Sequence, residues 1–175
     1  MNKKRFLAFV IIFTITISAQ WLYADANPNL SADLKNANGE SIGKVAFEFN
    51  ADGSVKLLLN AEGLSAGEHA FHIHDVGECI APDFQSAGSH FNPEQKQHGK
   101  NNPAGHHAGD LPNILVSDDG FAAMEVEIEA GRLTEAALLD GDGTSVLIHE
   151  RADDYATDPA GNAGARIACG VINKS

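Results

Sequence analysis

Short segments in which hydrophobic and polar residues alternate recur along most of the chain, and turns rich in Gly, Asp and Asn separate them. Segment 45–49 places Val, Phe and Phe at alternate positions, and segment 55–59 repeats the pattern with Val, Leu and Leu. Successive side chains of a strand point to opposite faces, so each segment predicts a strand with one buried face. The intervening Asn-Ala-Asp-Gly at 50–53 is typical of a turn, and the two segments are predicted to form a hairpin.

Further segments of the same character predict an all-β sandwich or barrel of about eight strands. The additional strands are predicted at 70–74, 113–116, 121–128, 145–149 and 165–171, with a weaker signal at 30–35. A helix could form at 133–139, but Gly131 before it and Asp-Gly-Asp-Gly at 140–143 after it keep it short.

Two long segments, 75–111 and 150–164, do not fit the strand pattern. Loops of that length in a compact domain are usually functional, or else they argue against the assignment of the neighbouring elements. These two segments contain most of the polar chemistry of the chain, which favours the functional interpretation.

The N-terminus has the order of a secretory signal peptide. Three basic residues at 3–5 precede an uncharged run at 6–18, which is shorter than the roughly 20 apolar residues that a membrane span needs. Cleavage could follow Ala19, Ala24 or Ala26, and we assign 1–26 to the signal peptide and 27–175 to the mature domain. We therefore expect a periplasmic or secreted protein with no membrane attachment after cleavage.

Composition limits the partners and the redox state of the mature protein. Removal of 1–26 takes away three basic residues and Asp25, so the net charge moves from −12 to −14. Such a charge argues against nucleic acid and anionic membranes as partners. The two cysteines, Cys79 and Cys169, are expected to form a disulfide in an oxidising compartment, although two free buried thiols are the alternative.

All eight histidines lie between positions 69 and 149. On a strand, His72 and His74 project from the same face and could hold one metal ion, although a His-x-His pair alone is weak evidence. Three more imidazoles and one carboxylate occur in the first long loop, a set suited to tetrahedral zinc. These four are His90, His98, His107 and Asp110.

Five motifs together resemble the copper/zinc superoxide dismutase family across essentially the whole mature chain. They are HAFHIHDVGEC, SAGSHFNP, HHAGDLPN, LLDGDGTSVLIHERADD and GNAGARIACGVI. The resemblance implies a Greek-key β-sandwich or flattened barrel, with the two long loops forming a metal site. It also implies an oxidoreductase that converts superoxide to dioxygen and hydrogen peroxide and that uses one copper and one zinc ion.

The resemblance also implies a role for each site residue. Copper would be bound by His72, His74, His90 and His149, and zinc by His90, His98, His107 and Asp110. His90 would bridge the two metals and take part in catalysis. Asp153 would hydrogen-bond His72 and His98, Arg166 would attract superoxide at the copper site, and Cys79 and Cys169 would form the internal disulfide.

Some features of the chain leave alternatives open. His106 is an additional imidazole, but His107 is favoured as the zinc ligand because it lies nine residues after His98 and three before Asp110. His69 is interpreted as a structural hydrogen-bonding residue. No lysine lies between His149 and Arg166, so Lys96 and Lys100 are the candidates to assist Arg166 in attracting superoxide.

The sequence allows one rival function and two oligomeric states. A non-catalytic copper-binding or copper-delivery domain of the same fold is the rival function, and it predicts missing ligands or a missing arginine. The sequence leaves both a monomer and a homodimer open.

Overall fold

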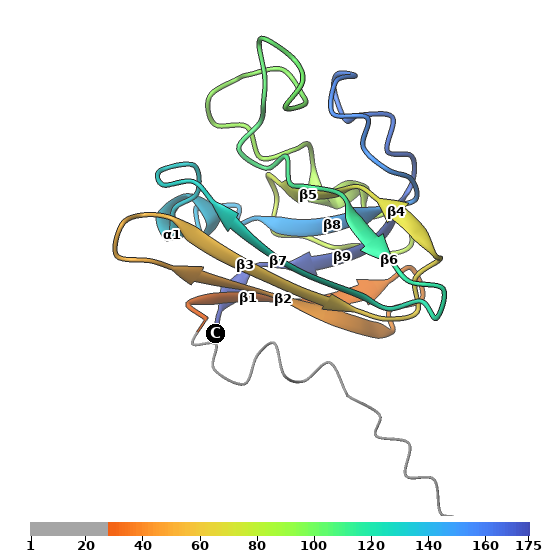
Figure 1. Cartoon of the computed structure of the whole chain (residues 1–175). Coiled ribbons are helices and arrows are strands. Elements are labelled where there is room, and N and C mark those ends of the chain that lie inside the picture. Colours follow the sequence, from red (N-terminus) through yellow and green to blue (C-terminus); the bar gives the residue numbers. More distant parts are fainter. Residues whose placement is uncertain (1–27) are drawn as a thin grey trace, which may run out of the picture.

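The computed structural model describes residues 28–175, so the predicted signal peptide and its cleavage sites lie outside the described residues. Within 28–175, no helix is long and apolar enough to cross a membrane. The strands form one curled antiparallel sheet, with a small two-stranded sheet beside it (Figure 1).

The main sheet has eight strands in the order β5-β8-β9-β1-β2-β3-β7, and β10 also pairs with β1. Their bounds are β1 Leu30–Asn36, β2 Ser41–Phe49, β3 Val55–Ala61, β5 Phe71–His74, β7 Ala122–Ile128, β8 Ser145–His149, β9 Arg166–Val171 and β10 Asn173–Lys174. The chain crosses from β3 to β5, back to β7 and again to β8, between the two ends of this order. Such crossings are of the Greek-key type, and the predicted all-β fold is confirmed.

The hydrophobic core fills the inside of the curled sheet. In the predicted hairpin, β2 and β3 pair with Val45 opposite Leu59 and Phe47 opposite Leu57. All four side chains are fully buried, as the alternation of the sequence predicts.

The structure adds short elements that the pattern did not indicate. Strand β4 (Gly67–His69) pairs with β6 (Ile114–Val116) in the small sheet. β4 comes just before the predicted strand at 70–74, and β10 has only two residues; segments this short carry too few alternating positions to be recognised. The predicted helix is a single turn, α1 (Glu135–Leu138). Thr134 caps its N-terminus, because Thr134 Oγ1 accepts a hydrogen bond from the N–H of Ala137.

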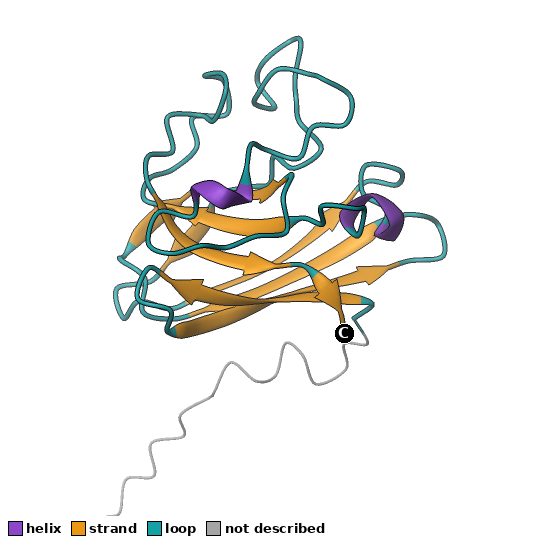
Figure 2. Cartoon of the chain, turned by 180° about the vertical axis from the view of Figure 1, so that it is seen from behind, coloured by secondary structure: helices purple, strands orange, loops and turns teal. Residues whose placement is uncertain are grey.

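The two predicted long loops are present. One joins β5 to β6 and contains only one 3₁₀ turn, Gln85–Ala87, and the other joins β8 to β9. Both extend beyond the same face of the sheet, where the later part of the first loop and the second loop stand side by side (Figures 1 and 2). This face is where the histidine-bearing ends of β5 and β8 meet the loops.

Candidate metal centre

Neighbouring strands place three histidines together. His72 and His74 alternate with core residues on β5, and β8 pairs with β5 and ends at His149. The N–H of His149 donates to Ala70 O at 2.9 Å, which fixes the end of β8 beside the start of β5. All three histidines are almost completely buried.

The long loop adds His90 to these three, since a β-bridge aligns His90 with His74. One ring nitrogen from each of His72, His74, His90 and His149 lies within 4.8 Å of the others. In each of these four rings, at least one buried nitrogen has no hydrogen-bond partner. Buried polar atoms without a partner are costly. Four such nitrogens converging on one point fit a metal ion, and an all-imidazole set suits copper.

A second set surrounds the carboxylate of Asp110. Asp110 Oδ1 lies 2.9, 3.0 and 3.1 Å from the Nδ1 atoms of His90, His98 and His107. The Nδ1 atoms of His107 and His90 are 3.4 Å apart. Zinc bonds of about 2.0–2.1 Å in a tetrahedron separate the ligand atoms by about 3.3 Å. The three nitrogens and one oxygen therefore have the chemistry and the spacing that tetrahedral zinc requires.

His90 belongs to both sets through different atoms. Its Nδ1 faces Asp110, and its Nε2 is buried without a partner on the side of the other histidines. The ring centroid of His90 is 4.1 Å from that of His72. The geometry thus allows one imidazole to contact both metal positions.

Burial keeps most of these rings neutral. It lowers the pKa of His90 to about 4 and that of His149 to about 3, and it also lowers the pKa values of His72 and His74. A neutral imidazole has a free lone pair, so these four are ready to bind a metal at neutral pH. His98 differs: burial opposes its protonation, but hydrogen bonds with Asp110 and Asp153 raise its pKa to about 9.

The backbone holds the Asp110 carboxylate in place. Asp110 Oδ2 accepts the N–H of Gly99 at 2.9 Å and that of His107 at 3.0 Å, which leaves Oδ1 toward the imidazoles. Burial alone would raise the pKa of this carboxyl, but the contacts with His107, His90 and His98 hold it well below its usual range. Asp110 is therefore charged, as a zinc ligand must be.

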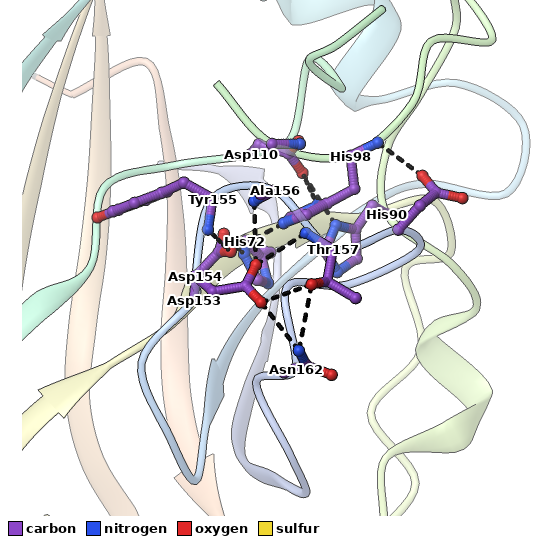
Figure 3. A network of polar contacts seen from close by, with 12 residues as sticks. His72, His90, His98, Asp110, Asp153, Asp154, Tyr155, Ala156, Thr157 and Asn162 are labelled. Carbon is purple, nitrogen blue, oxygen red and sulfur yellow. Dashed lines mark hydrogen bonds and ion pairs between the residues drawn. The ribbon is translucent and has the colours of Figure 1, made fainter. Parts of the chain in front are cut away.

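Asp153, from the second long loop, connects the two histidine sets (Figure 3). Its Oδ2 lies 3.0 Å from His72 Nε2 and its Oδ1 lies 2.9 Å from His98 Nε2. These contacts use the ring nitrogens opposite to those that face the metal positions, so they fix the orientation of both rings. Burial opposes ionisation of Asp153, but the two histidines hold its pKa well below the usual value.

A sequence profile described as copper/zinc superoxide dismutase (SODC) matches residues 41–172, which is most of the chain. The chain belongs to the copper/zinc superoxide dismutase family. Membership makes it an oxidoreductase and implies copper and zinc as its metals.

Bacterial relatives agree with this assignment. A protein of Aquifex aeolicus named superoxide dismutase [Cu-Zn] 2 is 48% identical over 145 residues, which cover 81% of this chain and 84% of that protein. A superoxide dismutase-like protein of Bacillus subtilis is 43% identical over 145 residues, 79% of this chain and 73% of that one. A crystal structure of a SOD-like protein from Bacillus subtilis matches with a TM-score of 0.75 and 41% identity, covering 81% of this chain and 96% of that chain.

The structure also brings together the other residues that the family resemblance indicated. Cys79 and Cys169 form a disulfide between the first long loop and β9. Arg166 begins β9 directly opposite His149, and its Nη1 and Nη2 donate to Phe84 O and Gly88 O, each at 2.6 Å. His107 lies in the set around Asp110, whereas His106 Nδ1 lies 2.8 Å from the backbone O of His107 and His106 is absent from both sets.

Two predictions concern polar residues outside these sets, His69 and the lysines of the first long loop. His69 has a hydrogen-bonding position, with Nδ1 2.7 Å from His149 O and Nε2 2.9 Å from Ser65 O. Of the two candidate lysines, Lys96 forms an exposed ion pair of 2.6 Å with Glu94, and Lys100 Nζ lies 3.9 Å from the centroid of the Tyr155 ring.

Sequence reasoning missed the residues that support Asp153. Asn113 Oδ1 accepts the N–H of Asp153 at 2.9 Å, and Asn113 Nδ2 donates to Asp153 O at 3.0 Å. The Tyr155 hydroxyl accepts the N–H of Asn113 at 2.7 Å, and the N–H of Tyr155 donates to Asp153 Oδ1 at 2.7 Å. The contacts of Asn113 span 40 or 42 residues of sequence, so no local spacing could have indicated them.

Asp154 organises the rest of the second loop (Figure 3). Its Oδ1 accepts the N–H groups of Ala156 and Thr157, and its Oδ2 accepts the Thr157 hydroxyl at 2.6 Å and Asn162 Nδ2 at 2.8 Å. These bonds lower the pKa of Asp154 to about 2. The loop that presents Asp153 is therefore shaped by its own neighbouring carboxylate.

Proposed function

We propose that this superoxide dismutase removes superoxide outside the cytoplasm and so protects the cell envelope. Copper would be held by His72, His74, His90 and His149, and zinc by His90, His98, His107 and Asp110. The reaction consumes two superoxide anions and two protons and yields one dioxygen and one hydrogen peroxide. When bound, copper would supply the one-electron chemistry that oxidises one superoxide and reduces the next, and zinc would hold the loop and the His90 ring.

His90 is the residue on which this proposal rests most directly. Its Nδ1 lies in the zinc set and its Nε2 in the copper set, so a doubly deprotonated ring would contact both metals. When Nε2 is free of metal it can hold a proton, because a ring nitrogen with no other partner is available there. His90 would thus deliver a proton beside the reacting oxygen anion.

Arg166 supports the choice of an anionic substrate. Two of its N–H groups are used by the Phe84 and Gly88 carbonyls, which hold the guanidinium beside His149. A guanidinium carries five N–H donors, so others remain for an anion at the copper position. Asp75 and Asp83 lie close enough to act on its charge, but neither forms an ion pair with it among the described residues.

Two features support a location outside the cytoplasm. The N-terminal segment has the order of a secretory signal peptide, and the disulfide between Cys79 and Cys169 is typical of an oxidising compartment. We therefore assign the protein to the periplasm or the exterior. Fractionation of cells that express the full chain should recover a shortened protein outside the cytoplasm, whereas full-length protein in the cytoplasm would contradict this assignment.

Metal analysis combined with a superoxide-consumption assay tests the function. The purified mature protein should contain one copper and one zinc per chain and should consume superoxide. Removal of one copper ligand in His149→Ala should abolish consumption and leave zinc bound. Wild-type protein that holds both metals without consuming superoxide would instead indicate a copper carrier.

A further inference from the structure

A partly buried arginine outside both candidate metal sets contacts the first long loop. Arg132 follows β7 and comes between Gly131, whose φ is +82°, and the buried Leu133. Leu133 anchors this connection in the core, so Arg132 is attached to the barrel rather than to the loop. Its Nε donates to Ala108 O at 3.1 Å, and its Nη2 donates to Asp110 O.

With these two bonds, every backbone carbonyl of the segment 107–110 accepts a hydrogen bond, and the end residues of this segment are the candidate zinc ligands His107 and Asp110. His107 O accepts the N–H of Asp110 at 3.2 Å, and Gly109 O accepts the N–H of Ile73 at 2.9 Å. The remaining carbonyls, those of Ala108 and Asp110, are the ones that Arg132 holds. One guanidinium therefore satisfies half of the carbonyls of this segment.

The planar guanidinium is important because it holds its two donors, Nε and Nη2, at a fixed distance and direction from each other. Arg132 fixes two carbonyls at a set separation, whereas a lysine presents a single point of charge on a flexible stem. The fixed backbone in turn aims the Asp110 carboxylate and the His107 ring, which lie on one short turn.

We propose that Arg132 is a positioning residue for zinc, which holds the segment 107–110 in the arrangement that the metal requires before the metal binds. This inference rests on the proposed zinc set. Arg132 does not contact the metal position itself, and its positive charge opposes a cation, so the benefit comes from geometry. Loss of the fork should therefore weaken zinc binding even when the charge is kept.

The test compares Arg132→Lys and Arg132→Gln with the wild type, each loaded with copper and zinc. Zinc release to a chromophoric chelator should be about tenfold faster in both variants, the lower end of the range for residues that orient metal ligands. The copper spectrum should change little. The thermal midpoint should fall less in the metal-free variants than in the loaded ones, because the metal-free protein loses only the two hydrogen bonds of Arg132, whereas the loaded protein also loses zinc affinity.

Arg151→Lys is the matched control. Arg151 Nε and Nη2 both donate to one carbonyl, Asn162 O, so Arg151 also binds backbone, but in the other long loop, which contributes no residue to the candidate zinc set. Its zinc release should stay within about twofold of the wild type.

Three results would overturn the proposal: zinc release from Arg132→Lys at the wild-type rate, equal acceleration in Arg151→Lys, or a loss of stability in the metal-free variants as large as in the loaded ones. Arg132→Lys keeps the charge and so decides the question if Arg132→Gln does not fold. A wild type that binds zinc and lacks dismutase activity would refute the proposed function alone. A wild type that binds no zinc would refute both.

Discussion

Replacement of Arg166 by Ile tests how an acidic protein attracts an anion. The mature chain carries a net charge near −14, so superoxide meets repulsion at long range. Arg166 pairs with His149 across β8 and β9, and the carbonyls of Phe84 and Gly88 hold its guanidinium, which would face the proposed copper position. For two unit charges about 4 Å apart at an effective dielectric constant near 20, the attraction is about 4 kcal/mol. Water and nearby carboxylates reduce it, so we expect kcat/KM to fall at least about tenfold, or about 1.4 kcal/mol.

The assay is superoxide decay by stopped flow at several salt concentrations, with both metals quantified in each sample. The wild type should slow as salt rises, because the Debye length falls from about 30 Å at 0.01 M to about 10 Å at 0.1 M. Arg166→Ile should retain both metals and show a weaker or reversed salt response, and Arg166→Lys should fall between the two. An Arg166→Ile protein as fast and as salt-sensitive as the wild type would refute the reasoning and assign the attraction to Lys96 and Lys100.

Three further predictions concern the metals and the disulfide. Asp110→Ala should weaken zinc binding and retain part of the copper, whereas His149→Ala should lose turnover and keep zinc. Full activity in His149→Ala, measured per bound copper, would disprove the copper set. Reduction of the disulfide between Cys79 and Cys169 should lower the thermal midpoint and speed hydrogen exchange in the first long loop. Chain-entropy arguments assign roughly 4–5 kcal/mol of stability to a disulfide that closes a loop of this size. An unchanged midpoint would contradict this prediction. The pKa of His98 is raised to about 9 in the metal-free protein, so zinc must displace a proton from this ring at neutral pH. Zinc affinity should therefore rise about tenfold per pH unit from pH 7 and level off above pH 9. A zinc affinity that does not change with pH would contradict the assignment of His98 as a zinc ligand.

The strands could be predicted where the core imposes a strict alternation. The pairing of β2 with β3 buries Val45, Phe47, Leu57 and Leu59, and that alternation is visible in the sequence. β4 and β10 were missed because their pairing depends on partners distant in sequence, such as β6 for β4. The order of strands in the sheet follows from long crossings that no local pattern records.

The site could be predicted as far as individual motifs reach. His72 and His74 share a strand face, and the spacing from His107 to Asp110 is that of one turn, so each pair is recognisable in the sequence. The contact of His90 with both sets depends on tertiary structure, because β5, β8 and the loop are brought together only in the folded protein. Asn113 and Arg132 carried no signal, because a polar side chain that binds distant backbone groups has the same appearance in a sequence as a solvated one.

The stoichiometry of superoxide consumption over many turnovers tests the central claim most directly. The protein loaded with one copper and one zinc would be mixed with a hundredfold excess of superoxide, and dioxygen and hydrogen peroxide would be measured together. The account predicts that superoxide disappears far faster than in a control with metal-free protein, with one dioxygen and one peroxide formed for every two anions and with no external reductant. Fast consumption of only about one superoxide per copper, followed by decay at the rate of the metal-free control, would show that the metal centre does not cycle, and would contradict the account.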